Sequence, residues 1–231
     1  MRRCYPLLLA CTMIVSGCAH SQTYTNLAPG DAEGAPSLAV LPEVPLGGAA
    51  DTRRTHQGLV LADRALQQRF PMPPEDRRRG ALQTWLEQDV VSWLVEREQL
   101  IEHVGFEFGM DGRALPAERI LGFAVLGLLR EDTARALRTI PAPTELASVP
   151  EIEQMFHEVV ESHAVPFLSA ALLAFRSCSD LALEGPESMQ HFAPYCDRRF
   201  RRLRDEVHAQ QALVLEGEDD RHRVVQGVLA E

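Results

Sequence analysis

Five arginines crowd a seven-residue stretch near the end of the chain: Arg198, Arg199, Arg201, Arg202 and Arg204. Guanidinium groups at this density can clamp phosphate or carboxylate groups, because each one presents a planar fork of N–H donors. The same residues can instead form a solvated helix face, since Asp197, Asp205 and Glu206 lie close enough to balance their charge. The neighbouring acids favour the solvated face, and we keep the five arginines as candidate residues for binding an anion or a partner.

Histidines and acids between residues 150 and 182 suggest metal binding as a second chemistry. A helical zinc motif needs two histidines four residues apart, so that both side chains point the same way. His157 and His163 are six residues apart and would point in different directions. Glu153, His157 and Glu161 do share a helix face and could hold a metal, but the pattern is more typical of a solvated stripe. We therefore predict no metal site and no cofactor.

The first 17 residues have the composition of a secretory signal. Arg2 and Arg3 give a positively charged start, and an apolar core follows over residues 7–15. This core is too short to cross a bilayer, which needs about 20 apolar residues. We predict that residues 1–17 are a signal peptide that is removed from the mature chain.

The residues directly after that core, Val15-Ser16-Gly17-Cys18, resemble the lipobox of bacterial lipoproteins. The resemblance implies cleavage before Cys18, a diacylglycerol on the Cys18 thiol and acylation of the new amino group. Several acyl chains hold a protein stably on a membrane. Ala19 follows the cysteine where Asp would favour the inner membrane, so we expect outer-membrane sorting. Cys11 also fits the motif loosely, but its apolar core would be only about four residues long.

The mature chain, residues 18–231, is acidic and contains no lysine. Loss of Arg2 and Arg3 with the signal changes the net charge from −10 to −12. We predict no nucleic-acid partner, because such binding depends on neutralising phosphates with basic groups. All 23 basic residues are arginine. This excludes chemistry that needs a lysine, such as a pyridoxal phosphate Schiff base or a P-loop.

Two regions of different character divide the mature chain. Residues 18–50 are rich in Pro, Gly, Ala, Ser and Thr without apolar periodicity, which predicts a disordered tether with a reach of roughly 30 Å. Over residues 51–231 the pattern is helical and strand signals are nearly absent. We predict an all-α domain of about five antiparallel helices in a helical-hairpin arrangement.

Apolar residues at three- and four-residue spacing define the expected helices. The first spans residues 51–70, and the second starts near Pro74 and continues to about residue 104. The third spans residues 116–140, and its segment 120–129 is apolar on all sides, which predicts the buried central helix.

The fourth expected helix begins at Ser148-Val149-Pro150-Glu151, which fits a capping box. Its apolar face starts at Ile152 and continues to about residue 182. Pro166 lies inside this helix and predicts a kink.

A disulfide is expected between the fourth helix and the last one. The last helix begins between Glu187 and Pro194. Signal cleavage and lipidation of Cys18 leave Cys178 and Cys196, an even pair in an oxidising compartment. Both lie next to the connection between the two helices, so they can meet at a helix–loop–helix corner. Such a bond would stabilise the fold by about 3 kcal/mol.

Two further resemblances are local. Glu161-Ser162, with Pro166 five residues after the Glu, is similar to the catalytic motif of lytic transglycosylases, in which the Glu is a general acid for glycan cleavage. The Gly-Ala-x-Gly-Leu-Met-Gln run of that family is absent here, and the expected serine is displaced to Ser169. Leu121-Gly122, with Val125 and Ala134, resembles the first half of a tetratricopeptide repeat, although no 34-residue period follows.

These features together predict a protein that is not an enzyme. We expect a periplasm-facing, outer-membrane lipoprotein, anchored through Cys18, that binds an envelope protein as a scaffold or assembly module. Pilotin-like lipoproteins are the closest analogy in function. The alternative is a peptidoglycan-cleaving envelope enzyme with Glu161 as its general acid.

Overall fold

The computed structural model describes residues 38–42, 52–112 and 114–208. The predicted signal peptide, Cys18 and most of the predicted tether therefore lie outside the described residues. Residues 38–42 belong to the predicted tether, but they form a 3₁₀ turn, η1 (Leu38–Val40), and Leu38 and Leu41 pack against the core.

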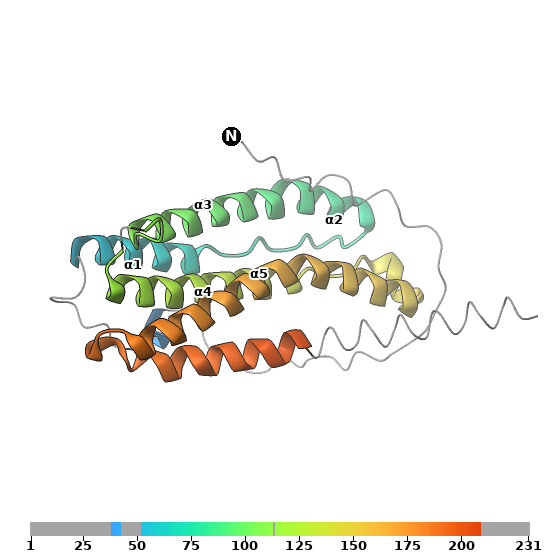
Figure 1. Cartoon of the computed structure of the whole chain (residues 1–231). Coiled ribbons are helices and arrows are strands. Elements are labelled where there is room, and N and C mark those ends of the chain that lie inside the picture. The colour runs from blue at the N-terminus through green and yellow to red at the C-terminus, as the bar shows by residue number, and fades with distance from the viewer. Residues whose placement is uncertain (1–37, 43–51, 113, 209–231) are drawn as a thin grey trace, which may run out of the picture.

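Five helical rods make up the described domain (Figure 1). The first is α1 (Thr52–Gln67), and the second joins α2 (Arg79–Trp85) to α3 (Val91–Glu107) through a π turn, Leu86–Val90. The others are α4 (Pro116–Arg138), α5 (Pro150–Glu184) and a helix over residues 192–208. No strand occurs in this part of the chain, which confirms the all-α prediction.

The central position of α4 follows from its apolar sequence. Its most extensive packing is with α5, and it also packs against α1 and α3 (Figure 1). Eight of the ten residues from Ile120 to Leu129 are buried, and Phe123 and Leu126 are partly exposed. The prediction of a buried central helix is confirmed, with one side of α4 left partly open.

Close approach of the helices depends on glycine at three positions. An added Cβ on Gly58 of α1 would come within 2.8 Å of the Phe108 ring, and one on Gly122 of α4 would come within 2.9 Å of the Phe108 Cβ. Gly127 of α4 faces Phe175 of α5 in the same way. The helices therefore pack more closely here than any other residue type would allow.

The chain turns from α3 to α4 through two residues with left-handed backbone. Gly109 has φ 66° and Gly112 has φ 106°. Residues with a Cβ rarely adopt these angles, so glycine fixes the place where α3 ends.

The start of α2 differs from the expectation. The helix begins at Arg79, and Asp76 instead pairs with Arg78, whose hydrogen bonds lower the pKa of that carboxyl from 3.8 to about 2. The N–H of Arg79 donates to the Glu145 carboxylate at 3.0 and 3.2 Å. An acid 66 positions further along the chain therefore caps this helix.

The predicted capping box at the start of α5 is wrong. The Ser148 hydroxyl donates to the backbone oxygen of Glu145 at 3.3 Å, within the 3₁₀ turn η3 (Thr144–Ser148). Val149 is the N-cap residue and Pro150 opens the helix. Ser148 therefore belongs to the 3₁₀ turn and does not cap α5. The helix then continues unbroken through Pro166.

Candidate functional site

The disulfide prediction agrees with the structure. Cys178 of α5 and Cys196 of the following helix are bonded, with their Cα atoms 6.0 Å apart. Both cysteines are fully buried. The bond lies at the helix–loop–helix corner and fixes the helix over residues 192–208 against α5.

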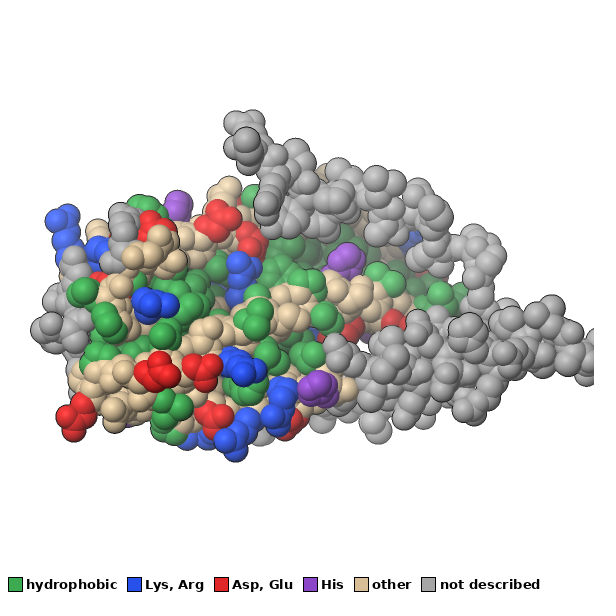
Figure 2. All heavy atoms as spheres, in the orientation of Figure 1, with side chains coloured by type: hydrophobic (Ala, Val, Ile, Leu, Met, Phe, Trp, Pro, Cys, Tyr) green, Lys and Arg blue, Asp and Glu red, His purple; other side chains and the backbone are tan. Residues whose placement is uncertain are grey.

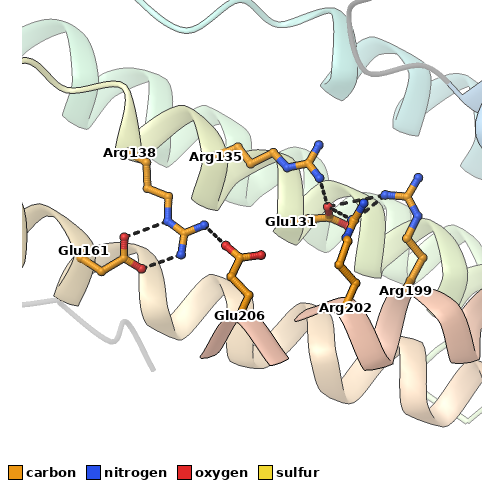
Figure 3. Close-up of polar contacts among 7 residues, drawn as sticks. All are labelled: Glu131, Arg135, Arg138, Glu161, Arg199, Arg202 and Glu206. Carbon is orange, nitrogen blue, oxygen red and sulfur yellow. Dashed lines mark hydrogen bonds and ion pairs between the residues drawn. The ribbon is translucent and has the colours of Figure 1, made fainter. Parts of the chain in front are cut away.

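Two of the five clustered arginines reach a carboxylate that the sequence pattern does not indicate. Arg199 and Arg202 both donate to Glu131 of α4, and Arg199 does so at 3.2 Å (Figure 3). Arg135, one turn along α4, donates to the same carboxylate. The Glu131 side chain is 3% exposed. One buried carboxylate therefore holds three guanidinium groups and ties the last helix to α4.

Two other arginines of the cluster behave as the solvated-face interpretation expects. Arg201 pairs with Asp197 at 2.8 Å and Arg204 with Asp205 at 2.9 Å, all on the exposed side of one helix. Glu206, the third expected acid, instead turns toward Arg138 of α4. Arg198 has no ion pair or hydrogen bond among the described side chains.

The Glu161 carboxylate forms an ion pair with an arginine, Arg138. Both of its oxygens accept hydrogen bonds from Arg138, at 2.8 Å from Nε and 2.6 Å from Nη2 (Figure 3). Burial opposes the charge on Arg138, but its bonds to Glu161 and Glu206 outweigh this and raise the pKa of the guanidinium. Arg138 therefore occupies both oxygens of the side chain that a general acid would have to present to a glycan.

No metal-binding group forms within residues 38–42, 52–112 and 114–208. These ranges bring together no set of three His, Cys, Asp or Glu side chains that could hold an ion. Glu153 is partly buried and His157 exposed along α5, and Glu161 pairs with Arg138.

The outward side of α5 carries an apolar stripe, which the sequence analysis missed. Its positions fit alternating steps of three and four residues along α5, of which four are polar: Ser162, Ser169, Arg176 and Asp180. Its apolar members are Ile152, Met155, Val159, Pro166, Leu173 and Leu183, all exposed. Leu173 is 64% exposed and Leu183 66%. Ile152, predicted for the buried face, belongs to this outward stripe. We call these six residues the α5 stripe.

A groove continues the α5 stripe toward α3. It has a volume of about 410 Å³ and runs between α3 and α5 over the partly open side of α4. Leu173 belongs to both the groove and the stripe, and Phe123, Leu126 and Glu102 also line the groove. Figure 2 shows apolar side chains on this face, over α5 and between α5 and α3. Leu173 therefore joins the two surfaces into one apolar face.

The composition of α5 reflects its two apolar sides. Its most apolar 18-residue window has a mean hydropathy of 1.3, enough by length and composition for a membrane span, and 33% of that window is buried. A soluble core helix with the same composition would be mostly buried. Much of the apolar surface of α5 is therefore left outside the bundle.

Comparison with protein-family models, with curated proteins and with solved structures gives no match. The function must therefore be argued from the residues and geometry of the chain itself.

Proposed function

We propose that this chain is a lipid-anchored helical module of the bacterial cell envelope that binds a helix of a partner protein along the α5 stripe. The stripe itself carries this proposal. Single exposed apolar residues are ordinary on a protein surface, but several exposed apolar residues that share one side of a helix mark an interaction site.

The spacing of the α5 stripe suits a helix as the partner. Ile152, Met155, Val159, Pro166 and Leu173 fit positions of a coiled-coil seam. Two intervening positions of that seam are serines, Ser162 and Ser169. A facing helix can place its own apolar residues between them, in the way that amphipathic helices dock into grooves.

The charges at the groove specify the partner further. Arg130 pairs with Glu98, so its charge is already balanced. Glu102 is exposed and lines the groove without an ion pair among the described residues. We therefore expect the partner helix to carry an arginine or lysine beside its apolar face, opposite Glu102.

The predicted anchor supports an envelope location. The lipobox-like Val15-Ser16-Gly17-Cys18 implies lipidation of Cys18, and the predicted tether would let the domain reach roughly 30 Å from the membrane. An acidic domain held at this distance suits a protein partner better than an anionic membrane surface.

Site-specific photo-crosslinking in the native host tests the proposed interface. A photoreactive residue at position 173 should give a crosslinked product with one envelope protein, because Leu173 lies where the stripe and the groove meet. The same probe at Gln99, an exposed polar position of α3, serves as the control. Leu173→Glu should abolish the product formed by a second probe at position 159.

Three results would contradict the proposal. They are no product from position 173, equal products from positions 173 and 99, or a product that Leu173→Glu leaves unchanged. A product with twice the mass of this chain would mean that the α5 stripe pairs two copies, which would replace the partner protein. Because Leu173 is exposed, its replacement should leave the fold intact, which circular dichroism can check.

A further inference from the structure

A second cavity, lined by residues of other elements than the α5 stripe, lies beside the arginine cluster. It has a volume of about 340 Å³ and is lined by Val40 of η1 and by Tyr195, Arg198, Arg199 and Arg202. Three arginine side chains thus line one small space, which favours a positive potential there.

The described carboxylates do not balance this charge. Glu131 is the one described carboxylate that pairs with Arg199 and Arg202, and it also pairs with Arg135, so less than one full negative charge is available for each of the two cavity arginines (Figure 3). Arg198 forms no ion pair with any described residue. The cavity therefore keeps an excess of positive charge and unused N–H donors on Arg198.

A buried hydroxyl is a second, independent sign of a ligand. Tyr195 is 8% exposed, and its buried hydroxyl has no hydrogen bond of regular geometry among the described residues, although the Arg199 side chain lies close enough to act on it. A buried polar group normally has a partner, because an unmet hydrogen bond costs about 1–3 kcal/mol. Burial also raises the pKa of Tyr195 above its usual 10, which keeps the hydroxyl protonated and able to donate. The Arg199 guanidinium lies over the ring at 5.6 Å.

We propose that Arg198, Arg199 and Arg202, together with the Tyr195 hydroxyl, form a binding site for a phosphate-type oxyanion. The chemistry favours phosphate over carboxylate. A phosphomonoester carries up to two negative charges and three free oxygens, and so can accept from several guanidinium forks and a hydroxyl at once. A carboxylate has one charge and two oxygens and would leave part of this set unused.

The site assigns different roles to neighbouring arginines. Arg198, Arg199 and Arg202 line the cavity, whereas Arg201 and Arg204 pair with acids of their own helix and lie outside it. Arg198 is the most informative residue to change, because it forms no ion pair or hydrogen bond within the described residues. Arg201 gives a matched control of equal charge, three residues away.

Calorimetric titration of the full chain in detergent with inorganic phosphate tests the site. The parent should bind phosphate, and Arg198→Gln should weaken binding about tenfold or more, since one charge-assisted contact to an anion is lost. Tyr195→Phe should weaken it severalfold. Arg201→Gln should bind as the parent does.

Vesicles distinguish a free phosphate from a lipid headgroup. Phosphatidylcholine vesicles with and without phosphatidic acid, whose headgroup is a phosphomonoester, are compared by co-sedimentation, so that any apolar anchor contributes equally to both. Preference for phosphatidic acid that is lost in Arg198→Gln and kept in Arg201→Gln would assign the site to a lipid headgroup. Phosphate binding without that preference would assign it to a soluble phosphate compound.

Two results would overturn the proposal. One is that neither inorganic phosphate nor phosphatidic acid is bound. The other is that Arg198→Gln and Arg201→Gln weaken binding equally, which would show only a diffuse positive surface. Neither result bears on the α5 stripe, since none of the substituted residues lies on α5.

Discussion

At the scale of single residues, the Glu131 carboxylate forms three ion pairs, all with arginines. It is buried on α4 and accepts from Arg135, Arg199 and Arg202, which come from two different helices (Figure 3). Burying a carboxylate is costly unless its charge is matched, and three arginines match this one amply. Glu131 is therefore a positioning residue that sets where the arginine cluster lies.

Glu131→Gln should destabilise the fold by about 1–3 kcal/mol, because it leaves the largely buried Arg199 without its counter-charge. This loss of stability is smaller than the loss expected for a fully buried ion pair. The side chains of Arg135 and Arg202 are exposed enough to be hydrated once Glu131 is replaced. Urea unfolding measures the change. Asp197→Asn, which breaks the exposed Arg201 pair, should cost less than about 1 kcal/mol. Equal stability of Glu131→Gln and the parent would show that the cluster does not depend on this carboxylate.

Glu161→Gln tests the alternative of glycan cleavage. Because both Glu161 oxygens are bound by Arg138, we expect a loss of roughly 1 kcal/mol of stability and no change in a peptidoglycan zymogram. The parent should produce no clearing. Clearing by the parent that Glu161→Gln abolishes would instead make Glu161 a catalytic acid.

At the scale of elements, the spacing between α4 and α5 is set by a glycine. A Cβ on Gly127 would lie 2.8 Å from the Phe175 ring, and that ring is fully buried. The two helices therefore pack with the ring directly against backbone. Such a contact tolerates no extra atom without movement of one helix.

Gly127→Ala should destabilise the protein by about 1–3 kcal/mol, although alanine is the better helix former. Gly80→Ala provides the control, because nothing lies within 4 Å of a Cβ at that position of α2. It should be neutral or slightly stabilising. Thermal unfolding measures the stability of both variants. A change in the same direction for Gly127→Ala and Gly80→Ala would contradict a steric role for Gly127.

The Cys178–Cys196 bond governs how the last helix docks. Its closed loop has a sequence separation of 18, for which replacing both cysteines by alanine should cost about 3 kcal/mol. Urea unfolding of the parent, with and without a reducing agent, and of the double variant measures the effect. Reduction should lower the stability of the parent and leave the variant unchanged. If the reducing agent left the stability of the parent unchanged, the Cys178–Cys196 bond would have no stabilising role.

At the scale of the whole molecule, the domain leaves an apolar face uncovered. The α5 stripe and the groove beside it adjoin at Leu173, and the arginine-lined cavity belongs to a different helix. The proposed helix-binding surface and the proposed anion site therefore use separate residues and could act at the same time.

Cys18→Ala should release the protein from membranes, if the lipobox-like motif is processed as its resemblance implies. Fractionation of the native host, with intact mass measurement, checks this prediction. The parent should begin at Cys18 with acyl chains and sediment with outer membranes, and the variant should not. An unlipidated, soluble parent would remove the envelope location from the proposed function.

The sequence by itself determined the local features of this protein. Apolar spacing predicted all five helical rods and the buried α4, and the composition predicted the Cys178–Cys196 bond. Helix formation depends on near neighbours, which the sequence displays directly. The lipid anchor stays a prediction, because Cys18 lies outside the described residues.

Only the tertiary structure decided which residues meet across the bundle. Glu131 lies 68 and 71 positions from its arginines, and Glu145 caps a helix 66 positions away. Apolar periodicity likewise could not show which side of α5 is buried, since apolar residues occur on both sides. Packing against α4 covers one side and leaves the α5 stripe exposed. Contacts of this kind depend on how helices dock, and many dockings satisfy the same local pattern.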